Sequence, residues 1–127
     1  MGNPTRFTSY WVRSRDITYA DTGSSAGIDV PANTFVKQVI LDVTSAFSTG
    51  GSVNVGDGDD ADGWIKAADI LISDGTVMLR VDTGGANYAA WGGKGYTTAD
   101  TIDVHITDST SGSLFIAAEF LPLADLD

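Results

Sequence analysis

The sequence predicts an all-β protein, folded as a single antiparallel β-sandwich or jelly roll. Several segments alternate apolar and polar residues with a period of two, which is the pattern of strands that bury one face. Clusters of Gly, Ser, Thr and Asp separate these segments and are typical of turns. The chain has 127 residues, enough for one hydrophobic core and one domain. Together these observations favour two packed sheets.

The predicted strands follow one another along the whole chain. They are expected at residues 6–13, 34–47, 52–56, 76–82, 101–107 and 113–121. Residues 65–72 are compatible with a short helix or with irregular backbone. Residues 83–97 contain five glycines and indicate a long structured loop.

The N-terminal segment differs from the rest of the chain in its charge. Arg6, Arg13 and Arg15 meet no acidic residue within the first fifteen positions. A short basic segment of this kind can contact an acidic partner surface. We therefore expect residues 1–15 to form an N-terminal arm and residues 16–127 to form the sandwich domain.

The longest predicted strand, residues 34–47, is rich in β-branched residues and long enough to bend or to contain a bulge. A strict period of two divides its side chains between an apolar inner face and a mixed outer face. The inner face holds Phe35, Val39, Leu41, Val43 and Phe47, and the outer face holds Val36, Gln38, Ile40, Asp42 and Thr44. Because Val36 and Ile40 are apolar, we expect a neighbouring protein to cover them.

The last two strands are predicted to form a C-terminal hairpin. In residues 101–107 the apolar positions alternate with polar ones, and the single histidine, His105, falls on the polar face. The expected core-facing residues of the hairpin are Ile102, Val104, Ile106, Leu114, Ile116, Ala118 and Phe120. The turn between the strands, Asp-Ser-Thr-Ser-Gly, has the composition that turns require.

Aromatic residues gather around the two glycine-rich loops. Exposed Trp and Tyr side chains anchor protein interfaces or stack on sugars, whereas buried ones close the ends of a sandwich core. The sequence leaves both interpretations open. The residues predicted to form an interface are Arg6, Arg13, Val36, Ile40, Trp64, Tyr88, Trp91 and Tyr96.

The most acidic stretch is VGDGDDADGW, residues 55–64. Its acidic residues are Asp57, Asp59, Asp60 and Asp62. Carboxylates are the ligands that Ca²⁺ prefers, but the EF-hand spacing fails, because position 5 counted from Asp57 is Ala61 and position 12 is Ala68. We interpret the stretch as a polar surface turn, with a non-standard calcium site at these four aspartates as the alternative.

Residues for the common catalytic sites are scarce. The chain has no cysteine, one histidine and one glutamate, Glu119, so zinc sites of the usual kinds and hydrolytic triads lack their ligands or their base. Lys94 in the sequence Gly-Gly-Lys-Gly is followed by Gly95 and not by the Ser or Thr of a phosphate-binding loop. A pair of aspartates for glycoside hydrolysis stays compatible with the composition. We expect no enzymatic activity and no cofactor.

The chain is strongly acidic, with 17 acidic and 7 basic residues and a formal net charge of −10. Such a charge repels the phosphates of nucleic acids and anionic lipid surfaces, so we expect neither as a partner. No stretch reaches the roughly 18 apolar residues that span a bilayer, and the N-terminal sequence lacks the apolar run of a signal peptide. We expect a soluble protein without a membrane partner.

The order of four segments resembles that of a known family. They are VPANTFVKQVILDVTSAFSTGG, SVNVGDGDDADGWI, GYTTADTIDVHIT and GSLFIAAEFLPL, and they span roughly residues 28–121. In this order and spacing the chain resembles small structural proteins of tailed-bacteriophage heads, of the capsid decoration or cement type. In that family a long strand ending in Ala-Phe precedes a Gly-Asp-rich turn, and two further strands follow. None of these motifs is catalytic.

The resemblance implies a β-sandwich or jelly roll that binds the major capsid protein lattice on the outer surface of the virion and stabilises the capsid. It also implies a homo-oligomer, most commonly a trimer, and makes the acidic turn a connection between strands. Two other functions stay open. One is a carbohydrate-binding or adhesin-like module that uses Trp64, Tyr88 and Trp91, and the other is a tail or neck component with the same fold.

Overall fold

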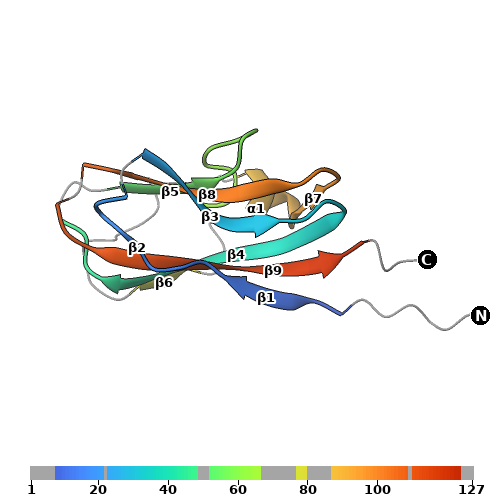
Figure 1. Ribbon diagram of the computed structural model, residues 1–127, viewed down its shortest axis with the longest axis horizontal. Helices are drawn as coiled ribbons and strands as arrows, with labels where there is room; N and C mark the ends of the chain where they lie inside the picture. The colour runs from blue at the N-terminus through green and yellow to red at the C-terminus, as the bar shows by residue number, and fades with distance from the viewer. Residues whose placement is uncertain are drawn as a thin grey trace, which may run out of the picture.

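The computed structural model describes residues 8–21, 23–48, 52–66, 77–79, 87–108 and 110–123. Within these residues the chain forms two antiparallel β-sheets that pack against each other, with one short helix beside them (Figure 1). The prediction of an all-β sandwich in a single domain is confirmed.

The larger sheet is built around two long central strands, β4 and β9. Its described strands are β1 (Tyr10–Arg13), β2 (Ile17–Thr18), β4 (Thr34–Ser45), β6 (Val77–Leu79), β7 (Lys94–Tyr96) and β9 (Ser113–Pro122). Strands β4 and β9 pair with each other along most of their length. The far edge of β9 carries β1 and β2, and the far edge of β4 carries β7 and β6.

The smaller sheet has β8 (Asp100–Thr107) at its centre, between β3 (Gly23–Val30) and β5 (Ser52–Gly56). Beyond β5, Ile65 forms an isolated antiparallel bridge with Val55. In Figure 1 this sheet lies above the larger one, and the turn that follows β5 lies beside the helix.

The core lies between the two sheets, and β8 and β9 both contribute to it. The predicted inward residues of the hairpin, Ile102, Val104, Ile106, Leu114, Ile116, Ala118 and Phe120, are all buried. The period of two on both strands is therefore confirmed as an inward–outward alternation.

Strand β4 contains a bulge, and this bulge corrects one predicted face. In the pairing with β9, Val36 lies opposite Phe120 and Gln38 lies opposite Glu119, so Lys37 is an extra residue. The inward positions therefore change from even to odd numbers at Lys37. Val36 is fully buried in the core and does not lie on the outer face, as a strict period of two had predicted. Ile40 does lie on the outer face, partly buried.

The segment predicted as a long loop, residues 83–97, contains regular structure. A short helix, α1 (Asn87–Trp91), is followed by β7, while residues 83–86 lie outside the described residues. The structure also contains β3, which the sequence did not predict.

Other predicted elements are only partly covered by the described residues. Of the alternative helix at residues 65–72, only Ile65 and Lys66 are described, and neither is helical. The predicted strand at 76–82 is described only over β6. Within the described part of the chain, no helix has the length and apolar character needed to cross a membrane.

Part of the predicted N-terminal arm belongs to the larger sheet. Residues 1–7, with Arg6, lie outside the described residues, whereas β1 pairs along its four residues with β9. The Ser14 hydroxyl accepts a hydrogen bond from the backbone N–H of Ile116, which continues this attachment. Any arm that extends away from the sandwich must therefore precede β1.

Candidate functional site

The acidic turn directly follows β5 and is fixed by its own first aspartate. Oδ1 of Asp57 accepts hydrogen bonds from the backbone N–H groups of Asp59 and Asp60, both at 3.0 Å. The backbone N–H of Asp57 donates to the Asp60 carbonyl, also at 3.0 Å. A Cβ atom at Gly56 would lie 2.0 Å from that carbonyl oxygen. Gly56 and Asp57 are therefore required by the backbone of the turn.

Three side chains from α1 and β7 complete the hydrogen bonds to Asp57. Lys94 Nζ and Tyr96 Oη each donate to Oδ2 at 2.7 Å, and Tyr88 Oη donates to Oδ1 at 2.9 Å. The Asp57 side chain is fully buried, and that of Lys94 is 17% exposed. One buried carboxylate thus accepts five hydrogen bonds, two from the backbone and three from side chains, so its burial costs little.

The pKa values of the cluster reflect this arrangement. Burial works against the charged form of Asp57, but the hydrogen bonds from Lys94, Tyr96 and Tyr88 outweigh it and hold the pKa of Asp57 below its usual value. Burial likewise works against the Lys94 ammonium, but its bond to Asp57 raises the pKa of Lys94. Burial raises the pKa of Tyr88 to about 12 and also raises the pKa of Tyr96. At neutral pH the cluster therefore holds one ion pair and two neutral phenols.

Aromatic packing joins this polar cluster to the core. The indole N–H of Trp64 donates to Tyr96 Oη at 3.1 Å, and the Trp64 and Tyr88 rings meet edge to face at 5.3 Å between centroids. Gly63 makes room for this contact, because a Cβ there would lie 2.4 Å from the Tyr88 ring. We call Asp57, Trp64, Tyr88, Lys94 and Tyr96 the Asp57 cluster.

The carboxylates near this turn include one group with the geometry to hold a metal ion. Oxygen atoms of Asp57, Asp59 and Asp100 lie within 4.8 Å of one another. This set shares Asp57 and Asp59 with the predicted calcium site but contains Asp100 in place of Asp60 and Asp62. Lys94 Nζ already contacts Asp57 at 2.7 Å and Asp59 at 3.2 Å, so an ammonium group supplies positive charge at this place. A metal ion would have to compete with it.

The predicted interface aromatics divide into two groups. Trp64, Tyr88 and Tyr96 are only 2%, 3% and 4% exposed, so they close the end of the core. Trp91 at the end of α1 is 68% exposed and packs against Tyr88 with 5.4 Å between ring centroids. The Arg13 side chain is also exposed, at 54%.

Sequence reasoning missed the exposed aromatic residues at the other edge of the molecule. Tyr10 and Trp11 on β1, and Tyr19 after β2, are each exposed over at least two fifths of their surface. The sequence did contain a signal that one of the two residues on β1 would be exposed. Tyr10 and Trp11 are consecutive in a strand, so they point to opposite faces and only one of them can face the core.

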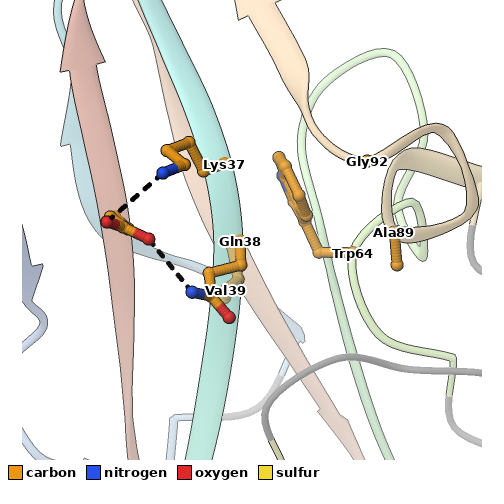
Figure 2. A pocket seen from close by; sticks show the side chains of 7 residues that line it. Lys37, Gln38, Val39, Trp64, Ala89 and Gly92 are labelled. Atoms are coloured by element: carbon orange, nitrogen blue, oxygen red, sulfur yellow. Dashed lines mark hydrogen bonds and ion pairs between the residues drawn. The ribbon is translucent and has the colours of Figure 1, made fainter. Parts of the chain in front are cut away.

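A pocket of about 230 Å³ lies beside the Asp57 cluster (Figure 2). Its lining residues are Lys37, Gln38, Val39, Trp64, Ala89, Gly92 and Glu119. Trp64 forms one wall and faces β4 across the gap, with Ala89 and Gly92 beside it. The opposite rim is polar, because Glu119 accepts a hydrogen bond from Gln38 at 3.0 Å and lies 3.7 Å from Lys37 Nζ.

Comparison by sequence finds no matching family model and no matching curated protein. Comparison by structure does find similar chains. A chain in the acidic stable capsid structure of Helicobacter pylori bacteriophage KHP30 has a TM-score of 0.68 and 11% identity, over 91% of this chain and 90% of that one.

Two further capsid structures contain chains of the same shape. The capsid asymmetric unit of cyanophage Pam1 gives a TM-score of 0.62 at 13% identity, over 96% of this chain and 90% of that chain. The capsid of Ralstonia phage GP4 gives 0.60 at 13% identity, over 95% and 89%. At these identities the likeness establishes the fold, a β-sandwich that also occurs in phage capsid structures.

Proposed function

We propose that this chain is a non-enzymatic virion protein that decorates and stabilises a phage capsid by binding the major capsid protein on its outer surface. The observation that supports this most is the likeness to chains in three phage capsid structures, over about nine tenths of both chains in each case. A resemblance of segment order, identified independently from the sequence, points to the same class of protein.

The chemistry of the Asp57 cluster agrees with a structural role. A general acid, a general base or a metal ligand has to face a substrate or an ion. The donors to Asp57 instead come from the chain itself, and its side chain has no exposed surface. The cluster joins the acidic turn to α1 and β7 and makes this end of the sandwich rigid. A rigid fold suits a protein that has to resist strain in a shell.

Decoration of a lattice does not require a tight single contact. Many copies bound side by side, or a trimer that binds at several points, turn weak contacts into stable attachment. We propose a homo-oligomer, with a trimer as the first expectation. Residues preceding β1, with Arg6, are proposed to run along a neighbouring subunit.

The carbohydrate-binding alternative loses its main support in the structure. It relied on Trp64, Tyr88 and Trp91 as a stacking surface, and two of these three residues are buried. A tail or neck component with the same fold stays as the second candidate, because the fold likeness alone does not distinguish positions in a virion.

The copy number of the chain in purified virions, relative to the major capsid protein, tests the proposal. A ratio near that of the shell protein would support lattice-wide decoration. A few copies per particle would place the chain in the portal, neck or tail. Absence from virions would refute the proposal and return the binding-module alternatives to consideration.

A further inference from the structure

The outer face of the larger sheet differs from the rest of the surface in its aromatic residues and in its charges. Trp11 on β1 lies opposite Glu119 on β9, and Glu119 lies opposite Gln38 on β4, so the three side chains form one row across the sheet. In the next row Arg13 lies opposite Ala117, and Ala117 lies opposite Ile40. Trp11 is 50% exposed, which is a large apolar surface to leave in contact with water.

Most charges on this face are already paired within the chain. Asp42 is the exception among the described residues, because it forms no ion pair and one of its carboxylate oxygens is buried without a hydrogen-bond partner. Arg13 forms an ion pair with Asp16 and also stacks over the Phe115 ring, with 3.9 Å from its guanidinium carbon to the ring centroid. Lys37 lies 3.7 Å from Glu119, and Gln38 donates to the same carboxylate. Burying a charge that has a partner costs far less than burying one without a partner.

The opposite side of the molecule, formed by the smaller sheet, carries acidic groups without ion-pair partners among the described residues. Asp29 and Asp103 point outward from the smaller sheet, and Asp100 and Asp108 lie at the two ends of β8. Among the described residues, none of these four aspartates forms an ion pair. Asp100 and Asp103 each accept one hydrogen bond from Thr101, but neither gains a counter-charge from the described residues. A partner that covered this side would therefore have to remove water from several carboxylates without an ion-pair partner. The chain has a net charge of −10, and burying the outer face of the larger sheet therefore costs less free energy of desolvation than burying the smaller sheet.

The row of Trp11, Glu119 and Gln38 leads directly to the pocket beside Trp64. The pocket opens at a gap in the sheet: β7 pairs with Thr34–Val36 and β6 with Leu41–Val43, and no described strand pairs with β4 between them on that edge. An engineered cavity of about 150 Å³ accommodates benzene, so a pocket of about 230 Å³ has room for one leucine or phenylalanine side chain.

We propose that the outer face of the larger sheet, from Trp11 to the pocket beside Trp64, is the surface that docks onto the shell of the virion. The partner it fits is a protein surface with little net charge that presents one apolar side chain to the pocket. Trp11 and Arg13 are of the residue types that carry most binding energy at interfaces, and they flank this surface. The acidic smaller sheet then faces solvent. This inference rests on the proposed function and names the face that performs it.

The test measures binding of the purified chain to heads of its own phage that were assembled without it. Trp11→Ser removes the exposed anchor, and Ala89→Met fills the pocket from α1. Asp29→Arg, on the opposite side, is the matched control. We expect Trp11→Ser to weaken binding about thirtyfold or more, the size typical of an interface anchor. We expect Ala89→Met to weaken binding as well and Asp29→Arg to leave it unchanged, while all three variants keep the melting temperature of the wild type.

Salt dependence gives a second measurement on the wild type. Because Arg13, Lys37 and Glu119, the charged groups between Trp11 and the pocket, are paired within the chain, binding should change by less than about threefold between low and physiological salt. Contacts between exposed unpaired charges are strongly screened over that range.

The outcomes separate the inference from the proposed function. If the wild type does not bind the heads, the proposed function is refuted and the docking face with it. If the wild type binds, and Trp11→Ser and Ala89→Met bind equally well, the inference alone is refuted. Loss of binding only in Asp29→Arg would assign docking to the smaller sheet. If Trp11→Ser changes the oligomeric state in sedimentation but not binding to heads, this face joins copies of the chain and the inference is wrong.

Discussion

Two regions of this molecule contain similar residue types but differ in burial. The Asp57 cluster contains one Trp, two Tyr, one acid and one base, and the surface around β1 contains Tyr10, Trp11, Arg13 and Glu119. In the first region the indole and both phenols are at most 4% exposed, and their polar atoms bind one another. In the second region the aromatic rings are about half exposed, and the ionic groups pair at the surface.

The difference lies in what the backbone places around each group. Asp57 follows a strand end at which two glycines, Gly56 and Gly63, let the turn and the Tyr88 ring approach closely. Strand β1 lies at the edge of its sheet, so one face and one edge remain uncovered by described strands. The same residue types therefore stabilise the core in one region and remain exposed on the surface in the other. The predictions that follow test this contrast, from the largest expected effect to the smallest.

Asp57→Asn should be the most damaging conservative substitution in either region. It leaves the largely buried Lys94 ammonium without its buried anion and turns an amide N–H toward groups that donate hydrogen bonds. We expect a loss of about 3 kcal/mol in the free energy of unfolding, measured by urea denaturation. Asp59→Asn is the control. Its side chain is 80% exposed and contacts the same ammonium, so its loss should be at most about 0.5 kcal/mol. Equal losses for both variants would contradict the role given to the buried carboxylate.

The Asp57 cluster should also give stability a broad optimum in pH. The lowered pKa of Asp57 means that its contribution is present above the usual carboxyl range and is lost as the pH falls through its pKa in the folded state. The raised pKa of Lys94, and that of Tyr88 at about 12, mean that their contributions are present below about pH 10 and are lost at higher pH.

Thermal denaturation between pH 2 and 11 measures this dependence. Asp57→Asn should flatten the acidic side of the curve but not abolish its slope, because hydrogen bonds also lower the pKa values of Asp21 and Glu119. An acidic side as steep in Asp57→Asn as in the wild type would show that other carboxylates determine it.

Removal of one hydroxyl compares the two regions directly. Tyr96→Phe deletes the group that donates to Asp57 and accepts from Trp64, and so leaves a buried N–H without its acceptor. We expect a loss of about 1–3 kcal/mol in the free energy of unfolding. Tyr10→Phe is the matched change on β1, where the ring is 45% exposed, and it should cost less than about 0.5 kcal/mol. Similar losses would mean that the two hydroxyl groups contribute equally to the free energy of unfolding, and that burial does not distinguish the two regions.

The sequence was sufficient to predict the sandwich and much of its core. The alternation in β8 and β9 has a purely local cause, so it can be read from the residues alone. The bulge at Lys37 cannot be read in this way, because it depends on the register between β4 and β9, which are far apart in the chain. For that reason Val36 was placed on the wrong face. Strand β3 was missed because its sequence, GSSAGIDV, has the small polar residues of a loop and becomes a strand only by pairing with β8.

The site was harder to predict for the same physical reason. The acidic turn was correctly taken as a turn, since Asp and Gly have strong local preferences. That its first aspartate would be buried and bound by Lys94, Tyr88 and Tyr96 could not be predicted, because those donors come from 31 to 39 positions further along the chain. Burial decides whether an aromatic residue belongs to a core or to an interface, and burial is a property of the assembled sheets.

Trp91→Ala should have a small effect on folding and a moderate one on assembly. The ring is 68% exposed and touches the Asp57 cluster only through Tyr88, so we expect a loss of about 0.5 kcal/mol in the free energy of unfolding. Trp91 ends the helix that carries Ala89, close to the proposed docking face but outside the rows that contain Trp11 and Arg13. Binding to heads that lack the chain should therefore weaken, but by less than in Trp11→Ser. A larger loss in Trp91→Ala than in Trp11→Ser would shift the centre of the contact from β1 to α1, and would make the pocket the anchor and the β1 surface its rim.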